Sequence, residues 1–385
     1  MATGRGSAGG RITVDFVNQG TSGSAVMGHG RVEAALRKSF EKSDVIDARF
    51  VTLPSWTPLQ RAASAHWPPL SRFDLDMQAL RWHLVEAHRA RRAVRPMLQD
   101  LRPDLLHVSS HVAAFRIADL GIPYLINVDA TVDQWESMEL PGHPRRRYSS
   151  RLLGLSRRLE RRVFEQADAI VAMSEWSAEG VRAVVPDAEV HVIHPGLDLD
   201  LYGPATREER AKVGGDTVRV LFVGGRFEEK GGPLLLEAME PLLGNGFELD
   251  LVTTKRGVGT RSTRWQHLPP EDPQLLRLYR LADVVCLPTS RDAVPWVVLE
   301  AFAAGTPVIG TAVGALPESV GMRAERGAIT PAGDVGLLRA VLHDVRAERQ
   351  AWAQRGKAAV AHAQEKFDVT AQASQLKNLL IAQRP

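Results

Sequence analysis

Short apolar runs alternate with longer amphipathic stretches along the whole chain. Apolar residues at helical spacing occur in the longer stretches, for example at 77–99, 151–166, 232–243 and 337–349. The short runs hold four to six residues each, bounded by turn residues, a pattern typical of buried parallel strands. They cover 12–17, 105–108, 124–128, 169–172, 190–193, 218–223, 248–252, 284–288 and 307–310. Strand and helix in alternation predict βαβ units, and therefore an α/β fold of doubly wound parallel sheets.

These strands are too many for one comfortable sheet, and the pattern breaks at Tyr202–Asp216, where Gly, Pro and charged residues replace periodic apolar ones. We therefore predict two Rossmann-like domains whose sheets face an interdomain cleft, because such sheets bind ligands beyond the carboxyl ends of their strands. The last helical stretch is expected to pack back on the first domain. The predicted bounds are an N-terminal domain at 1–203 with a disordered start at 1–9, a linker at 204–217, a C-terminal domain at 218–366 and the returning helix at 367–385.

Composition excludes several classes of protein. Of the 385 residues 44% are hydrophobic and 24% are charged, which is typical of a globular chain. The 48 Lys and Arg barely outnumber the 45 Asp and Glu, and there is no polybasic arm, so nucleic acid is not an expected partner. The single cysteine, Cys286, excludes an intramolecular disulfide framework and a cysteine-based zinc cluster. Without a secretory signal or a long apolar segment, the chain is expected to be soluble and cytoplasmic.

A glycine-rich turn follows the strand predicted at 218–223. Gly224 and Gly225 lead into Arg226, and Lys230 and Gly231 stand before a predicted helix. Glycines let backbone N–H groups approach an anion, and a helix N-terminus adds partial positive charge. Arginine can chelate phosphate oxygens, and lysine supplies a point charge. The turn therefore indicates a phosphate site, although an ordinary strand-to-helix turn with a solvated lysine has the same pattern.

Two further loops follow strands of the same predicted sheet. Asp292 stands where a helix N-cap belongs, and Pro295 suits the first turn of that helix. Glu300 lies about two turns further on among Val, Leu, Ala and Phe, so its carboxylate needs a partner, and the diol of a ribose is suited to it. The alternative is that Asp292 only caps the helix and Glu300 pairs with a neighbouring arginine. The loop 311–318 follows the next strand and ends in Glu318.

Together these motifs resemble the retaining glycosyltransferases of family 4, which have the GT-B architecture of two Rossmann-like domains. The resemblance runs from Ile12 to about residue 335 and is strongest over 218–320. Family members carry a V-G-R-x-x-x-x-K-G turn, an E-x7-E block followed by A-x-A-x-G-x-P-V, a G-G-x-x-E loop and an I-P-x-G-V-D segment. The corresponding residues here are Lys230-Gly231, Asp292 with Glu300, Ala301–Val308, Gly314–Glu318 and Ile193–Asp198.

The resemblance implies a role for each matching residue. Arg226 and Lys230 would bind the donor diphosphate and balance its charge as the sugar–phosphate bond breaks. Glu300 would hold the ribose, and Asp292, in the place of the first glutamate, would contact sugar hydroxyls. The implied donor-binding residues are Gly224, Gly225, Arg226, Lys230, Asp292, Ala293, Val294, Pro295, Trp296 and Glu300.

The chain departs from the family pattern at three points. Its first acid is Asp292, one methylene shorter than glutamate, so the reach to a sugar changes. The usual G-F-G is replaced by 293–295, Ala-Val-Pro, which removes flexibility and one N–H donor. Arg226 stands four residues before Lys230, where five is more common. We expect a reshaped sugar pocket, and the resemblance does not identify the sugar.

The N-terminal half carries fewer signals. The residues in the place of the first glycine-rich loop of the family, near the reaction centre, are Gly20, Thr21, Ser22 and Gly23, although a plain loop has the same composition. His107 lies inside a predicted strand, where a core histidine is the better interpretation. His111 follows that strand and could act in catalysis by contacting acceptor or donor sugar. Asp129 ends the next strand and could orient an acceptor hydroxyl, or only cap a turn.

We therefore predict a retaining transferase that moves a hexose from a nucleoside-diphosphate sugar to an acceptor hydroxyl of a glycan, glycolipid or small molecule, in polysaccharide, glycolipid or other glycoconjugate biosynthesis. No cofactor or metal is expected, because no D-x-D-like pair ends a strand, and Arg226 with Lys230 can neutralise the charge. Two alternatives stay open. One is a catalytically silent sugar-nucleotide-binding or scaffolding protein, and the other is a different GT-B enzyme, such as a nucleotide-sugar epimerase.

One segment indicates a further partner. His143–Val163 holds eight arginines against a single acid, Glu160. Its apolar residues at helical spacing are Leu152, Leu155, Leu159 and Val163. A basic amphipathic helix over 145–163 can lie on an anionic membrane, which would make the protein membrane-peripheral. The alternative is a solvated arginine face over a core stripe.

Overall fold

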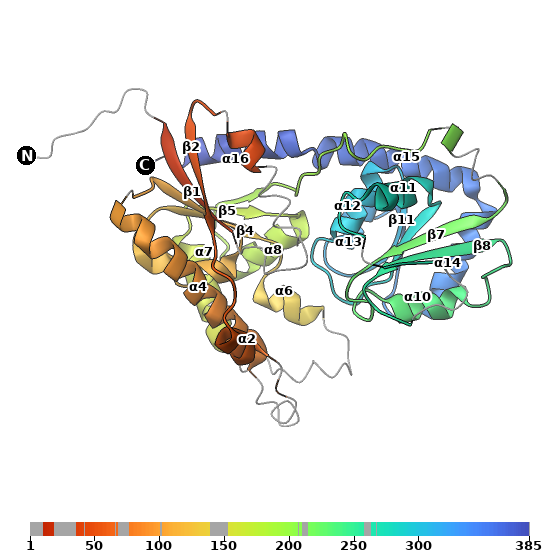
Figure 1. Cartoon of the computed structure of the whole chain (residues 1–385), viewed down its shortest axis with the longest axis horizontal. Helices are drawn as coiled ribbons and strands as arrows, with labels where there is room; N and C mark the ends of the chain where they lie inside the picture. Colours follow the sequence, from red (N-terminus) through yellow and green to blue (C-terminus); the bar gives the residue numbers. More distant parts are fainter. Residues whose placement is uncertain are drawn as a thin grey trace, which may run out of the picture.

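Two parallel sheets of six strands form two domains that lie side by side (Figure 1). The strand order is β2-β1-β3-β4-β5-β6 in the N-terminal sheet and β12-β11-β10-β7-β8-β9 in the C-terminal sheet. This is the predicted α/β class with two doubly wound sheets. The computed structural model describes residues 11–18, 36–41, 43–65, 67, 77–100, 102–138, 153–206, 208–209, 215–257, 263–266 and 268–384.

The N-terminal domain consists of strands with helices on both faces of the sheet. Its strands are β1 (Ile12–Asn18), β2 (Ile46–Thr52), β3 (Leu105–Val108), β4 (Tyr124–Val128), β5 (Ala169–Ala172) and β6 (Val190–Val192). Its helices are α2 (Pro58–Ser64), α4 (Gln78–Asp100), α5 (His111–Ala114), the 3-10 turn η1 (Ala118–Leu120), α6 (Val132–Ser137), α7 (Gly154–Gln166) and α8 (Glu175–Val184). The central strands β3, β4 and β5 are buried along their whole length, as expected of parallel strands covered on both faces.

The C-terminal domain repeats this plan. Its strands are β7 (Val218–Val223), β8 (Phe247–Thr253), β9 (Thr263–Gln266), β10 (Val284–Leu287), β11 (Val308–Thr311) and β12 (Gly327–Thr330). Its helices are α10 (Gly232–Met239), α11 (Pro273–Leu281), α12 (Trp296–Ala303), α13 (Leu316–Val320), α14 (Val335–Ala347) and α15 (Arg349–Lys366). Leu235, Leu338 and Leu342 pack on one face of the sheet, and Tyr279 and Phe302 on the other.

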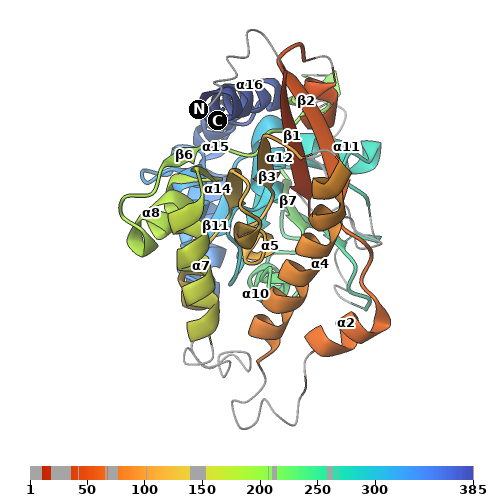
Figure 2. The same cartoon turned by 90° about the vertical axis from the view of Figure 1, so that its left-hand side faces the viewer.

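The last helix, α16 (Val369–Ala382), belongs to the N-terminal core. Leu376 and Leu380 are buried in the same apolar cluster as Val14 and Phe16 of β1. The turn before α16 is fixed to the end of the N-terminal domain, because Leu197 N–H donates to the carbonyl of Phe367 at 2.7 Å. Figures 1 and 2 show α15 and α16 running along one side of the molecule from the second domain to the first. The chain from α15 to α16 therefore connects the two domains covalently, and the packing of α16 on the N-terminal core adds a non-covalent connection.

Three strands of the structure lie outside the predicted set. They are β2, β9 and β12, and each lies at an edge of its sheet. An edge strand is covered on fewer sides than a central one, and β2 alternates buried, partly buried and exposed residues instead of forming an apolar run. Four of the runs predicted as buried parallel strands agree residue for residue with β3, β4, β5 and β7.

Candidate active site

Two loops at the carboxyl edge of the C-terminal sheet are joined into one surface. The backbone carbonyl of Glu229, in the turn between β7 and α10, accepts hydrogen bonds from Thr289 Oγ1 and from the backbone N–H of Ser290, both at 3.0 Å. Gly231 adopts a left-handed φ of +79°, and a Cβ at this position would lie 1.9 Å from the carbonyl oxygen of Pro288. Only glycine allows this approach, so the turn after β7 is held against the loop after β10.

Lys230 and Asp292 meet on this surface. The Lys230 ammonium donates a hydrogen bond to Asp292 Oδ2, and the two side chains are 16% and 13% exposed. Asp292 is therefore not the helix N-cap that the sequence predicted. The cap of α12 is Pro295, three residues later, and the Asp292 carboxylate is turned to the lysine. A cation and a carboxylate predicted separately as donor contacts thus lie together, partly open to solvent.

The second cation of the turn is more exposed. Arg226 is 59% exposed and pairs with Glu229 of the same turn, at 2.9 Å between Nη1 and Oε2. Gly224 lies against the Lys230 side chain, because a Cβ there would be 3.0 Å from the lysine Cβ. Gly225 has open space around it. At the sheet edge the turn therefore presents Lys230, which is paired with Asp292, and Arg226, which is largely exposed.

The segment between Asp292 and α12 supports a neighbouring loop. Ala293 is buried, and its carbonyl accepts a hydrogen bond from Ala315 N–H at 2.9 Å. Val294 is half-buried, and Pro295 is buried. Trp296 packs against the apolar clusters of both domains. The loops after β10 and β11 therefore form one unit, and Trp296 connects it to the N-terminal domain.

Glu300 is held below the surface by two tyrosines. Its side chain is 3% exposed, Tyr279 OH donates to Oε2 at 2.6 Å, and Tyr202 OH donates to Oε1 at 3.4 Å. The carboxylate thus joins α12 to α11 and to the chain that enters the C-terminal domain. Both sequence interpretations of this residue assumed other partners, namely a ribose or an arginine. Lys230 contacts Asp292, whereas Glu300 contacts the two tyrosines. The role of Glu300 in ribose binding remains a prediction.

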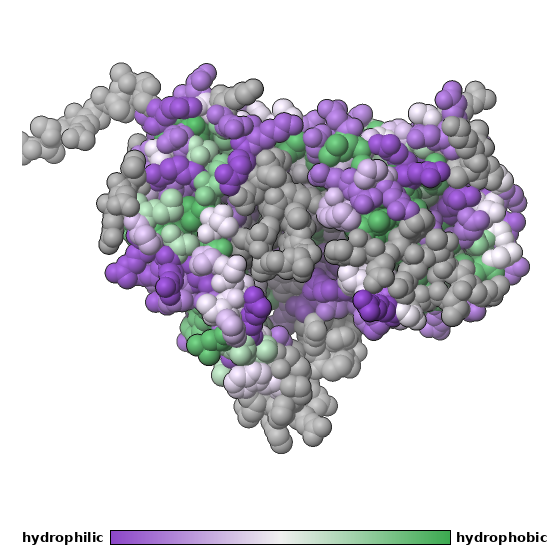
Figure 3. Space-filling view, in the orientation of Figure 1, coloured by the Kyte–Doolittle hydropathy of each residue, from purple (hydrophilic) through white to green (hydrophobic). Residues whose placement is uncertain are grey.

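Loops at the carboxyl ends of the two sheets contact each other. Both carboxylate oxygens of Glu318, in α13, accept backbone N–H groups at 3.0 Å, one from Glu175 and one from Trp176 at the start of α8. The Arg291 guanidinium, just before Asp292, lies 5.1 Å from the ring centroid of Trp135 in α6. The predicted donor edge therefore faces the carboxyl edge of the N-terminal sheet. In Figure 3 the surface is hollowed where the two domains meet, with hydrophilic side chains in the hollow.

On the N-terminal side, Asp129 lies at the end of β4, near the domain interface. Its Oδ1 accepts the N–H of Ala130 at 2.9 Å, and its carbonyl accepts Ser177 Oγ at 2.6 Å. The side chain caps its own turn and stays half-buried. The predicted loop residues Gly20, Thr21, Ser22 and Gly23 lie outside the described residues.

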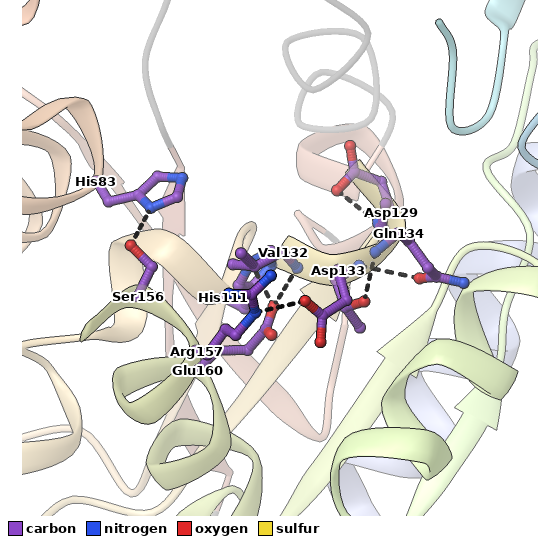
Figure 4. A network of polar contacts seen from close by, with 11 residues as sticks. His83, His111, Asp129, Val132, Asp133, Gln134, Ser156, Arg157 and Glu160 are labelled. Atoms are coloured by element: carbon purple, nitrogen blue, oxygen red, sulfur yellow. Dashed lines mark hydrogen bonds and ion pairs between the residues drawn. The ribbon is translucent and has the colours of Figure 1, made fainter. Parts of the chain in front are cut away.

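His111 is buried instead of facing the domain interface. It is 4% exposed, and its Nε2 lies 3.2 Å from Glu160 Oε1 (Figure 4). Its ring contacts Phe115 and Phe164. Burial lowers the pKa of His111 to about 3. The predicted contact with a sugar is not supported by this arrangement, because the ring packs against Phe115, which follows α5, and against Phe164 of α7.

Glu160 was missed as a site residue because the sequence shows it only as the single acid among arginines. It is 1% exposed and accepts the N–H of Val132, at the start of α6, at 2.8 Å. Burial raises the pKa of Glu160 to about 8. Arg157, one turn earlier, pairs with Asp133 and Glu136 of α6. Helix α7 therefore holds α6, which carries Trp135, against the domain interface (Figure 4).

No group of three or more His, Cys, Asp or Glu side chains within the described residues is arranged to hold a metal ion. The charged residues described at the donor edge include Lys230 with Asp292 and Arg226 with Glu229. That metal is unnecessary stays a prediction.

Two family models match the chain in succession. The model described as Glycosyltransferase Family 4 matches residues 33–201, and the one described as Glycosyl transferases group 1 matches residues 217–345. Among curated proteins, the D-inositol 3-phosphate glycosyltransferase of Mycolicibacterium smegmatis is 31% identical over 198 residues, which are 46% of this chain and 45% of that protein. A protein of that kind from Catenulispora acidiphila is 28% identical over 56% of this chain and 58% of its own. The matched part of the chain thus spans about half the length of these relatives.

Solved structures share the fold at low identity. Sucrose-phosphate synthase from Thermosynechococcus elongatus has a TM-score of 0.73 at 18% identity, over 97% of this chain and 98% of its own. HepE from Anabaena in complex with UDP-glucose has a TM-score of 0.67 at 15% identity, over 97% and 100%. These neighbours support the GT-B architecture. Between them, the family models account for most of both domains, and the chain therefore belongs to the family 4-type glycosyltransferases.

Proposed function

We propose that this chain is a retaining hexosyltransferase that uses a nucleoside-diphosphate sugar and serves glycoconjugate biosynthesis. The observation that carries the proposal is the meeting of Lys230 with Asp292 at the carboxyl edge of the C-terminal sheet. The Asp292 loop contacts the N-terminal domain through Arg291, whose guanidinium lies over Trp135, and the neighbouring α13 contacts α8 through Glu318. Ligands of such sheets bind at this edge, and a donor held there would lie between the domains.

The proposed donor contact is electrostatic. Arg226 and Lys230 bring two positive charges to one turn that leads into the N-terminus of α10. Both features favour a diphosphate. Asp292 keeps the lysine ammonium in place before a donor arrives, which lowers the cost of ordering it on binding. A sugar attached to the diphosphate would then lie near the Asp292 carboxylate, whose free lone pairs can accept its hydroxyls.

The proposed reaction needs no protein nucleophile. The bond between the sugar carbon C1 and the donor phosphate oxygen breaks, and the acceptor oxygen forms its bond to C1 on the same face. The acceptor proton moves to the departing phosphate oxygen, so nucleoside diphosphate and glycoside are released. In this scheme the chain contributes positioning and charge stabilisation of the leaving diphosphate by Lys230 and Arg226.

The comparisons support the class of substrates. One structural neighbour, HepE, is known in complex with UDP-glucose, which supports a nucleoside-diphosphate hexose as donor. Relatives named D-inositol 3-phosphate glycosyltransferases support a polyhydroxylated acceptor. The ribose of the donor is assigned to Glu300, whose carboxylate would exchange the weaker of its two tyrosine contacts, the 3.4 Å one from Tyr202, for ribose hydroxyls.

Neither alternative is favoured by a feature of the structure. Product analysis with a donor panel, with and without acceptor, separates the three. Transfer predicts a glycoside that forms only with acceptor, together with free nucleoside diphosphate. Release of an epimerised sugar, or binding without turnover, would reject transfer. The proposal includes a cytoplasmic location and contact of 145–163 with a membrane; residues 145–152 of that segment lie outside the described residues.

A further inference from the structure

Two long helices on the outer face of the N-terminal domain carry a strongly positive surface. Figure 2 shows α4 and α7 on the side that faces away from the C-terminal domain, with the short helix α5 between them. Among the described side chains of α4 and α7 the acids are Glu86 and Glu160, which are 2% and 1% exposed, and Glu165, which is exposed near the end of α7. Glu86 pairs with the equally buried Arg89. Apart from Glu165, the exposed charged side chains described on these two helices are therefore basic.

A groove of about 300 Å³ lies on this face and concentrates the charge. Its lining is His88, Arg91, Arg92, Arg95, Pro96 and Arg116, defined here as the arginine groove. Asp119 lies beside it and is shared between Arg91, at 3.5 Å, and Arg162 of α7, at 2.7 Å. Four guanidinium groups around one hollow, with one carboxylate at its rim, create a positive potential that an external anion would neutralise.

Exposed apolar side chains accompany the arginines. On α4, Leu84 is 38% exposed and lies one helical turn before His88 of the groove, and Trp82 is 37% exposed. On α7, Leu155 is 45% exposed and lies one turn before the exposed Arg158. A helix face that combines leucine or tryptophan with arginine suits the boundary between lipid headgroups and acyl chains. A binding surface for nucleic acid would not need the leucines.

We infer that the outer face of α4 and α7 docks on an anionic lipid bilayer, with lipid phosphates in the arginine groove. In this arrangement Leu84 and Leu155 enter the headgroup region. Within the described residues no helix is long and apolar enough to cross a bilayer, so the contact is peripheral. The proposed surface includes α4 as well as α7. Its arginine groove lies outside 145–163, the segment for which the sequence predicts membrane contact. The inference does not depend on glycosyl transfer.

Vesicle flotation without donor or acceptor tests the inference. The full chain is mixed with phosphatidylcholine vesicles, or with vesicles in which part of that lipid is replaced by phosphatidylglycerol. We expect binding only to the anionic vesicles, falling with salt because the attraction is screened. Each arginine near an anionic surface contributes roughly fivefold to the partition, so Arg92→Gln with Arg95→Gln should weaken binding by about twentyfold or more.

A matched control separates this face from overall charge. Arg323 and Lys357 are exposed in the C-terminal domain, and Arg323→Gln with Lys357→Gln removes the same charge there. The control should bind as the wild type does, and Leu84→Ser should weaken binding while leaving all charges in place. Equal binding by wild type and the groove variant, or equal loss in the control, would overturn the inference. Complete displacement by millimolar inorganic pyrophosphate at constant ionic strength would also overturn it, since the site would then serve a soluble anion. Unchanged thermal unfolding of each variant excludes misfolding as the cause.

Discussion

Replacing Lys230 by methionine removes one positive charge from the donor edge and keeps most of the side-chain length. Asp292, 13% exposed, then loses its cation, which should lower the free energy of unfolding by about 1–2 kcal/mol, because both groups keep some solvent. If Lys230 also stabilises the departing diphosphate, kcat/KM should fall by at least about 10²-fold, equivalent to roughly 2.7 kcal/mol of transition-state stabilisation. The loss of stability involves Asp292, whereas the loss of kcat/KM involves the donor diphosphate. The two losses differ in size and can be measured separately.

A double-mutant cycle on this pair makes the distinction. Asp292→Ala alone leaves Lys230 unpaired, and the double variant Lys230→Met with Asp292→Ala has neither charge. We expect the double variant to recover part of the lost stability in chemical denaturation, while its kcat/KM stays at or below that of Lys230→Met, because Asp292 is itself a proposed sugar contact. Lys230→Arg serves as the charge-conserving control. Wild-type-like turnover of the double variant would show that Lys230 only neutralises Asp292, and would refute its role at the donor.

Three further predictions concern the loops and the domain interface. Gly231→Ala should destabilise the fold by at least about 2 kcal/mol in urea unfolding, because its Cβ would meet the carbonyl of Pro288; an unchanged midpoint would contradict the strained turn. Glu318→Ala removes the acceptor of two α8 N–H groups and should increase the radius of gyration in small-angle scattering, whereas Glu318→Gln, which keeps one oxygen, should change it less. Burial raises the pKa of Glu160 from 4.5 to about 8, so its contribution to stability is present at low pH and is lost as pH rises toward 8. Between pH 6.5 and 8 the free energy of unfolding should fall by up to about 2 kcal/mol in the wild type, and Glu160→Gln should flatten that slope; parallel curves would contradict it.

The central strands and the donor turn could be predicted because their signals are local. Buried parallel strands such as β4 are apolar along their whole length, and the turn with Lys230 is a short run of glycines and cations. Asp292 was predicted at the same edge because it follows the next strand of the sheet. Its bond to Lys230, across 62 residues, depends on how two loops pack and has no local signal.

Residues whose partners come from distant elements could not be predicted. Glu300 needed a partner because it lies on an apolar helix, but the hydroxyl of Tyr202 reaches it across 98 residues. His111 follows a strand, as an active-site histidine often does, yet α7 covers it and supplies Glu160. The sequence shows which strands end in polar residues. The packing of the helices determines which of those polar side chains remain accessible to solvent.

The role of Lys230 in donor binding is tested most directly by titration calorimetry of the wild type and Lys230→Met with UDP, GDP, ADP and their hexose derivatives. We predict that one nucleoside diphosphate series binds with micromolar affinity, and that removing the Lys230 charge weakens that binding by at least about tenfold. If no diphosphate binds, or if the two proteins bind it equally, the diphosphate site is not at the edge formed by β7 and β10.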